Sequence, residues 1–285
     1  GLRCAERVLV EVAAFPARSF EELFQGVLAV DWAAYIPKNG AFPVKGWSLA
    51  SQLASVPDCQ AIVKKAVVEK LKQTHQVFWF EETGERYQIQ FSIHKDQVSI
   101  LLDTSGEGLH KRGYRAHAGE APIKETLAAG IVDLARIREG DIVYDPLCGS
   151  GTLLVEAAMR ALNIAPGLRR TFAAERWQTF DQKAFSLARQ QALDEANPGG
   201  DFEGYGFDID PQAVELTLQN AKLAGVGEKI SARVEDITRH KLQDAGGILL
   251  SNPPYGERML GPAQVKAIHQ ALGKMHRYNN LKSYI

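Results

Sequence analysis

The chain has 285 residues, with 33 Lys and Arg against 34 Asp and Glu and a formal net charge of −1. With 45% hydrophobic and 24% charged residues it is typical of a globular protein of one or two domains, which excludes disordered, collagen-like and coiled-coil chains. No uncharged apolar run reaches the roughly 18 residues of a membrane span and the charged start is not a signal peptide, so we expect no membrane partner. Three cysteines without a CxxC pair predict no disulfide framework, which fits a reducing, cytoplasmic location.

The first half of the chain is predicted to fold as an α+β domain. Apolar residues recur at helical spacing over 19–32, after the N-cap candidate Ser19. A second helix is expected over 60–73, where four lysines lie largely outside the apolar stripe; they indicate a solvated face or a face near nucleic-acid phosphates. Alternating apolar residues on both sides of HKDQ then predict a β-hairpin over 87–102.

The segment DTSGEGLHKRGYRAHAGEAP interrupts this pattern with glycines, a proline and a basic–aromatic cluster. Such a composition marks a linker between domains. Its side chains Lys111, Arg112, Tyr114 and Arg115 are either a solvated charge cluster or contacts for RNA phosphates.

The second half alternates strands and helices, which predicts a parallel sheet wound with helices. The expected strands and helices are, in order, 141–147, 151–162, 202–210, 211–225, 229–236 and 246–255. The long interval between the first two strands indicates an inserted helical excursion over 163–200.

The first motif of this half is DPLCGSGT, where a buried strand ends at Asp145 and a helix follows a glycine turn. Gly149 and Gly151 would let a ligand approach the backbone, and the helix N-terminus offers free N–H groups. The turn is also compatible with a simple strand–helix connection. Neither the P-loop pattern GxxxxGK[ST] nor the full fingerprint GxGxxG is present.

Two acidic motifs follow the next two strands. Asp208 of GFDID could accept hydrogen bonds from ribose hydroxyls, whereas Asp210, directly before Pro211, is interpreted as a helix N-cap. Asp236 of VED could accept a hydrogen bond from an adenine amino group, or it could be a solvated loop residue.

The fourth motif, SNPPY, is the most specific. Two consecutive prolines remove two N–H donors and make a rigid turn with outward-facing carbonyl groups. The Asn252 side chain and the Pro253 carbonyl could accept both hydrogens of an exocyclic NH₂, while Tyr255 could stack on the ring of a planar base.

These four motifs, in this order, resemble those of S-adenosylmethionine-dependent amino-methyltransferases. DPLCGSGTLLVEAA, APIKETLAA and SNPPYGER are similar to one subgroup, the THUMP-containing guanine-N2-methyltransferases of large-subunit (23S) rRNA, which are often labelled N6-adenine-specific DNA methylases. SVPDCQAIVKKAVVEKLK and LLDTSGEGLHKRGYR resemble the THUMP module of that family and its connection. The resemblance covers nearly the whole chain.

The resemblance implies an α/β fold in which a Rossmann-like methyltransferase sheet follows an α+β RNA-binding domain. We expect a THUMP-like domain over 1–105, a linker over 106–122 and a methyltransferase domain over 123–285. Against the pattern of the family, the first domain is expected to be incomplete at its N-terminal side and the last at its C-terminal side.

The resemblance also implies the roles of individual residues. S-adenosylmethionine would be bound by Ile123, Lys124, Thr126, Asp145, Pro146, Cys148, Gly149, Ser150, Gly151, Asp208, Ile209, Asp236, Ile237 and Asn252. The target base would be held by Asn252, Pro253, Pro254 and Tyr255, and ribosomal RNA by Lys111, Arg112, Tyr114 and Arg115. Direct transfer to an aligned amine needs no general base.

Three alternatives remain open at this stage. An N6-adenine methyltransferase of DNA or RNA would use the same NPPY logic, and the THUMP-like half argues against DNA. A non-catalytic RNA-binding protein with a relic methyltransferase fold would be expected to have lost Asp208 or Asn252, and both are intact. A nicotinamide oxidoreductase lacks support because the third fingerprint glycine is missing. Three cysteines without a CxxC pair and the absence of HxxxH spacing argue against a metal site.

Overall fold

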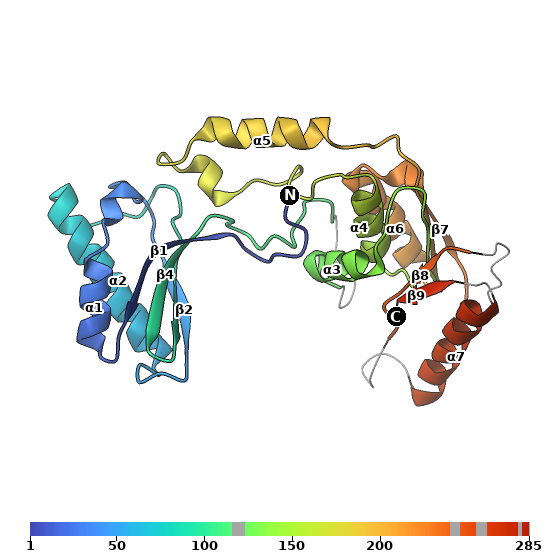
Figure 1. The fold of residues 1–285 in the computed structure, drawn as a ribbon, viewed down its shortest axis with the longest axis horizontal. Helices are drawn as coiled ribbons and strands as arrows, with labels where there is room; N and C mark the ends of the chain where they lie inside the picture. The colour runs from blue at the N-terminus through green and yellow to red at the C-terminus, as the bar shows by residue number, and fades with distance from the viewer. Residues whose placement is uncertain (116–122, 240–245, 255–260, 279–280, 285) are drawn as a thin grey trace. The chain divides into compact units, whose positions relative to one another are not determined.

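The computed structural model of the protein describes residues 1–115, 123–239, 246–254, 261–278 and 281–284. The chain forms two compact units that are interleaved in sequence (Figure 1). The N-terminal unit consists of Arg7–Gly108 and Thr171–Ser186, and the C-terminal unit consists of Gly1–Glu6, Leu109–Arg170 and Leu187–Ile285. The segment expected to be a linker therefore contributes its residues 109–115 to the C-terminal unit, where Leu109, Arg112 and Tyr114 are buried.

A four-stranded sheet forms the core of the N-terminal unit, with strand order β1-β4-β3-β2. Its strands are β1 (Leu9–Pro16), β2 (Val44–Leu49), β3 (Ile89–His94) and β4 (Gln97–Asp103). The predicted hairpin is confirmed, since β3 and β4 pair antiparallel with Ile93 opposite Val98. The edge strand β2 runs parallel to β3.

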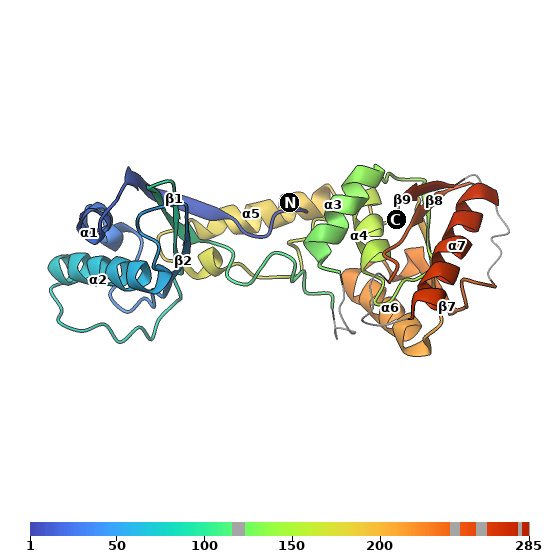
Figure 2. The same cartoon turned by 90° about the horizontal axis from the view of Figure 1, so that it is seen from below.

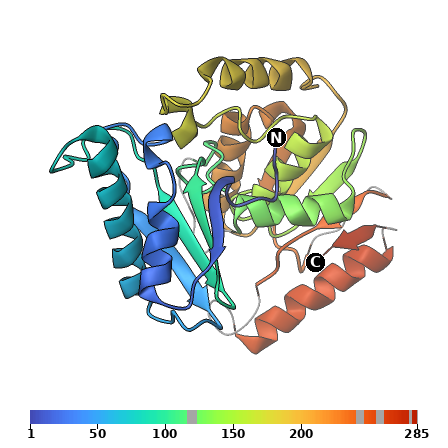
Figure 3. The same cartoon turned by 60° about the vertical axis from the view of Figure 1, so that its left-hand side comes forward.

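Two helices, α1 (Phe20–Leu28) and α2 (Val56–His75), pack on one face of this sheet (Figure 3). Ser19 begins α1 as predicted, in a capping box with Glu22. On α2, Lys64 is half-buried and donates to the Phe42 carbonyl at 3.0 Å and to Glu82 at 2.6 Å, so this lysine has a structural role. Short helical turns lie at Trp32–Ala34 (η1) and Ala173–Arg176 (η2).

The C-terminal unit contains the predicted parallel sheet, with five strands among the described residues in the order β7-β6-β5-β8-β9. These are β5 (Ile142–Asp145), β6 (Glu203–Asp208), β7 (Ile230–Val234), β8 (Ile248–Leu250) and β9 (Lys282–Tyr284). All four pairings are parallel. From β5 the chain builds the sheet in one direction through β6 and β7, and then in the other through β8 and β9. Ligands of open parallel sheets bind at such a reversal of order, outside the carboxyl ends of the strands.

Helices cover both faces of this sheet (Figure 2). Helices α3 (Glu125–Ala135), α4 (Thr152–Ala161) and α6 (Pro211–Ala224) share a core with Val143 of β5. Helix α7 (Pro262–Tyr278) packs on the opposite face, where Leu272 and Met275 contact the cluster around Tyr144. The remaining elements are α5 (Gln182–Asp194) and η3 (Gly227–Lys229). Among the described helices, none has the length and apolarity that crossing a membrane requires.

Candidate functional site

A buried carboxyl group joins two of the predicted motifs at the reversal of strand order. Asp145 ends β5 and is only 1% exposed. Its Oδ1 accepts hydrogen bonds from Ser251 Oγ, just after β8, at 2.8 Å and from the Leu147 N–H at 3.2 Å. Burial raises the pKa of Asp145 to about 7, although these hydrogen bonds act in the opposite direction. Asp145 therefore can change its charge near neutral pH.

The glycine turn after β5 has the conformation that the sequence predicts. Gly149 has φ +53° and Gly151 has φ +74°, a region that favours glycine. A Cβ atom on Gly149 would meet nothing within 4 Å, whereas one on Gly151 would lie 2.7 Å from Thr217 Cγ2. The first glycine thus faces open space, and the second is needed for close packing.

Asp208, at the end of β6, holds this turn in place. Its Oδ2 accepts the Gly149 N–H at 2.9 Å, and its Oδ1 accepts the Asp210 N–H at 3.0 Å. A carboxylate has about four acceptor positions, so two remain for a ligand. Asp210 is the N-cap of α6, as predicted, because its side chain accepts the Gln212 N–H at 2.9 Å.

Two polar residues of α6 that the sequence analysis did not identify support the glycine turn. Thr217 Oγ1 donates to the Gly149 carbonyl, and Asn220 Nδ2 donates to the Ser150 carbonyl, both at 2.9 Å. Both side chains are fully buried. Their spacing in the sequence could have identified them. Two polar side chains three residues apart lie on the same face of a helix, and where that face is buried they need hydrogen-bond partners.

Cys148 lies within the turn but is not a reactive thiol. Its side chain is buried and contacts Thr217 Oγ1 at 3.5 Å. Burial raises the pKa of the Cys148 thiol, so that the neutral form is present at physiological pH. Pro146 is buried as well.

The acidic motif after β7 forms a turn of its own. Asp236 Oδ1 accepts the Thr238 N–H at 2.8 Å and the Thr238 hydroxyl at 2.7 Å, and these hydrogen bonds lower the pKa of Asp236. Ile237 is buried, whereas Ile209, after β6, is 70% exposed. Ile209 thus offers an apolar surface beside Asp208, while Ile237 belongs to the core.

The residues expected to border the cofactor before β5 lie at the start of α3. Lys124 is its exposed N-cap, and Ile123 is half-buried. Thr126 is buried, and its hydroxyl donates to Glu6 at 3.1 Å. Glu6 also contacts His110 Nδ1 at 2.6 Å. These contacts attach the first residues of the chain to the C-terminal unit.

The SNPPY motif follows β8 directly. Asn252 is exposed, Pro253 is buried and Pro254 is half-buried. The neighbouring Ser251 contacts Asp145, so Asn252 lies one residue away from that contact. Tyr255 lies outside the described residues.

Two of the four expected RNA contacts are buried inside the C-terminal unit. Arg112 is 3% exposed and donates from its guanidinium to the carbonyls of Leu109 and Arg3. Tyr114 is 1% exposed and donates to Glu156 at 3.1 Å, and burial raises the pKa values of both groups. The expected RNA contact does not fit Arg112 and Tyr114, because neither side chain reaches the surface. Lys111 is exposed.

This placement gives a stability prediction for Arg112. Arg112 Nε lies 3.5 Å from Glu156 Oε1, and both side chains are buried. Replacing Arg112 by Gln should therefore lower the free energy of unfolding by about 3 kcal/mol, because the Glu156 charge loses its partner. Urea unfolding measures this loss. The control is Arg160→Gln, which removes an exposed pair with Asp133 and should cost at most about 1 kcal/mol. Equal losses in the two variants would contradict a buried ionic role.

Arg115, the fourth expected RNA contact, joins three segments of the C-terminal unit. Its Nε donates to Glu125 at 2.8 Å, and its second terminal nitrogen donates to the Ile123 carbonyl at 3.2 Å and to the Thr152 hydroxyl at 3.0 Å. Thr152 Oγ1 in turn lies 3.1 Å from Ser150 Oγ in the glycine turn.

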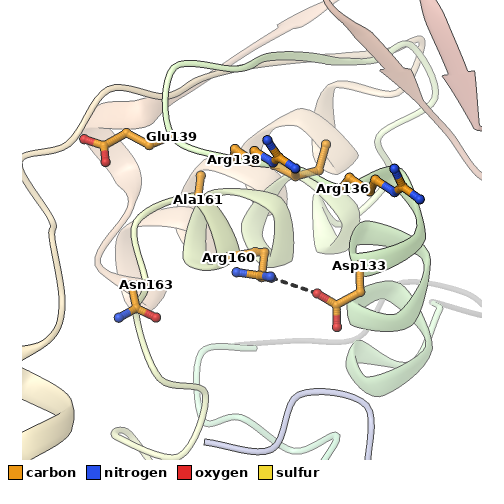
Figure 4. Close-up of a pocket in the computed structure, with 8 residues that line it drawn as sticks. Asp133, Arg136, Arg138, Glu139, Arg160, Ala161 and Asn163 are labelled. Atoms are coloured by element: carbon orange, nitrogen blue, oxygen red, sulfur yellow. Dashed lines mark hydrogen bonds and ion pairs between the residues drawn. The ribbon is translucent and has the colours of Figure 1, made fainter.

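A separate cavity of about 350 Å³ lies elsewhere in the C-terminal unit (Figure 4). Residues at the C-terminal ends of α3 and α4 line it. Arg160 points toward Asp133, and its Nε donates to Asp133 Oδ1 at 2.8 Å. Its lining residues lie before β5 and at the end of α4, whereas Asp145 is the last residue of β5. The cavity contains none of the predicted site residues.

Comparisons with known proteins agree with this architecture. Residues 112–283 match the family model described as RMKL-like, methyltransferase domain, and residues 17–103 match the THUMP domain. The chain is 44% identical over 275 residues to YpsC of Bacillus subtilis (strain 168), named as a candidate RNA methyltransferase; the match covers 96% of this chain and 71% of that protein.

Solved structures give the same result. A protein of Listeria monocytogenes described as a predicted N6-adenine-specific DNA methylase is 42% identical, with a TM-score of 0.92, over 97% of this chain and 73% of its own. SMU.472, described as a candidate methyltransferase and solved in complex with SAH, is 40% identical with a TM-score of 0.88, over 98% of this chain and 74% of its own. The two predicted domain types are thereby confirmed.

Proposed function

The chain belongs to the family of RMKL-like methyltransferases with a THUMP domain, and we propose that it methylates the exocyclic N2 amine of a guanine in large-subunit (23S) ribosomal RNA. The coarser activity, S-adenosylmethionine-dependent methylation of RNA, follows from family membership. The observation that carries the proposal is the contact between Ser251 and Asp145, which brings the base-binding motif next to the cofactor motif.

The residues around Asp145 suit S-adenosylmethionine, which supplies an electrophilic methyl group when bound. Gly149 faces open space and Asp208 retains acceptor positions for ribose hydroxyls. Asp145 is the candidate partner for the ammonium group of the methionine moiety, and Asp236 and the exposed Ile209 are candidates for the adenine. Ile123, Lys124 and Thr126 would border the same region.

The second part of the proposal concerns the target base. Asn252 is exposed and follows a buried strand, so its side-chain carbonyl is available to accept a hydrogen bond from an amino group. The Pro253 carbonyl would accept the second one. Two acceptors hold the amine and favour a pyramidal nitrogen whose lone pair points at the methyl group. Tyr255 remains the proposed stacking partner. No general base is assigned, since the proton can leave after transfer.

The choice between guanine and adenine does not follow from NPPY, because both bases carry an exocyclic amine. RNA is favoured by the THUMP match over 17–103, and guanine by the resemblance of the motifs to the guanine-N2 subgroup. Among the described residues, no group of three or more His, Cys, Asp or Glu side chains could hold a metal ion.

Nucleoside mass spectrometry of ribosomal RNA tests this proposal. RNA from cells with and without the gene should differ in N2-methylguanosine of the large subunit, and the wild-type gene should restore it. The control is restoration by Asn163→Ala, which changes an exposed residue that bonds the Glu195 carbonyl. A difference in N6-methyladenine instead, on RNA or DNA, would overturn the substrate while leaving the cofactor assignment intact.

A further inference from the structure

The side chain of Arg115 is mostly buried, yet its guanidinium is only partly hydrogen-bonded. The side chain is 16% exposed. Its Nε and one terminal nitrogen make the three hydrogen bonds to Glu125, Ile123 and Thr152. The other terminal nitrogen, Nη1, is buried and has no hydrogen-bond partner.

A buried donor without a partner is unusual in a native protein. Leaving such a group unsatisfied costs about 1–3 kcal/mol, and more when the group is charged. Buried polar groups are therefore nearly always paired, with protein, water or a ligand. The unpaired Nη1 of Arg115 indicates that an acceptor occupies this position in the functional protein.

The surroundings of Arg115 identify the kind of acceptor. Thr152 is the first residue of α4, and the N–H groups at a helix N-terminus favour anions. Glu125 Oε1 lies 2.8 Å from Arg115 Nε and already neutralises part of the guanidinium charge. A single small anionic group is therefore enough to complete the hydrogen bonding of Arg115. Thr152 also links Arg115 to Ser150 in the glycine turn, so the missing acceptor is expected from the ligand that this turn binds.

We propose that Arg115 binds the carboxylate of the methionine moiety of S-adenosylmethionine. This inference rests on the proposed use of that cofactor, and it adds a cofactor-binding residue that the sequence analysis interpreted as a solvated charge or an RNA contact. Arg115 and Asp145 would then divide the methionine end between them, with the guanidinium on the carboxylate and the Asp145 carboxyl on the ammonium group. The planar guanidinium can bind the carboxylate while it keeps its hydrogen bonds to Glu125 and Thr152. A lysine ammonium group cannot make all of these contacts in the same geometry.

Calorimetry with two ligands separates carboxylate binding from a purely structural role. Wild-type protein should bind S-adenosylmethionine more tightly than its decarboxylated form, which lacks only the carboxylate. Arg115→Met should weaken binding of S-adenosylmethionine by roughly 10- to 100-fold and leave the decarboxylated ligand within a few-fold of wild type, because the lost interaction is absent from that ligand. Arg115→Lys should give an intermediate result, since it keeps the charge without the fork.

The matched control is Arg160→Met, an arginine of the same unit that also pairs with a carboxylate at 2.8 Å. It should change neither affinity. Equal weakening of both ligands by Arg115→Met would overturn the inference and make Arg115 a support of the glycine turn through Thr152. Unchanged affinity for S-adenosylmethionine would overturn it as well. Should wild-type protein bind neither ligand, the proposed function itself fails, so the two failures are distinguishable.

Discussion

Replacing Asn252 by Ala should lower the rate of methyl transfer about 10²- to 10³-fold while leaving the affinity for S-adenosylmethionine nearly unchanged. The side chain is exposed directly after β8, where it can hold the target amine. Removing one preorganised polar contact in a site of this kind has an effect of that size. Single-turnover kinetics with saturating RNA measure the rate, and calorimetry measures the affinity.

Asn163→Ala is the control for this experiment, because it removes an exposed asparagine of the same unit whose side-chain amide donates to the Glu195 carbonyl. It should leave both quantities unchanged. A single-turnover rate of Asn252→Ala within about threefold of wild type would show that Asn252 does not hold the reacting amine.

The second large effect is expected at Asp145. Its replacement by Asn should weaken the binding of S-adenosylmethionine and at the same time stabilise the folded protein above neutral pH. The amide keeps an oxygen acceptor for Ser251 and Leu147. It lacks the negative charge that the ammonium group of the cofactor requires, so binding should weaken roughly 10- to 100-fold, as for a lost hydrogen bond to a charged group.

The direction of the stability change follows from the raised pKa. Burial raises the pKa of Asp145 from 3.8 to about 7, which means that folding disfavours the charged form. The stability from this group is fully present below about pH 3.8 and is lost as pH rises through about 7. The amide of the Asp145→Asn variant does not titrate. The difference in free energy of unfolding between variant and wild type should therefore shift in favour of the variant by about 2–3 kcal/mol from pH 5 to pH 8.

Urea unfolding of both proteins at several pH values checks this difference, and Asp201→Asn, at an exposed position, is the control. A difference that does not change between pH 5 and pH 8 would show that Asp145 is already charged in the folded protein at pH 5. In wild type, cofactor affinity should also fall as pH drops below about 7, because the carboxyl group becomes protonated.

The sequence predicted the parts of the fold whose pattern is local. Ser19 and Asp210 cap helices as expected, and the strands of the DPLCGSGT and GFDID motifs lie where their apolar runs place them. Strand β2 was not predicted, because Gly46 and Ser48 occupy its inner positions while the apolar Trp47 and Leu49 are exposed, so its hydrophobicity does not follow its burial.

A residue of the candidate site could be predicted where its type and its position after a strand indicate its role. It could not be predicted where its role depends on a hydrogen-bond partner far away in the sequence. Asp208 and Gly149 were identified from their positions after strands. Thr217, whose partner lies 68 residues away, was not. Arg112 and Tyr114 look like surface residues of a basic segment, and only the tertiary structure reveals that Glu156 pairs with both.

The interleaving of the two units has a consequence for how the protein is made. Trp177, from the segment Thr171–Ser186, stacks on Tyr87 with ring centres 4.8 Å apart and donates to the Arg86 carbonyl at 3.1 Å. The core of the N-terminal unit is therefore incomplete until Ser186 has been synthesised. During translation, when domains ordinarily fold one after another from the N-terminus, this unit has to wait while α3, β5 and α4 of the other unit emerge from the ribosome. The N-terminal unit is thereby expected to complete its core only after the first part of the C-terminal unit has been synthesised.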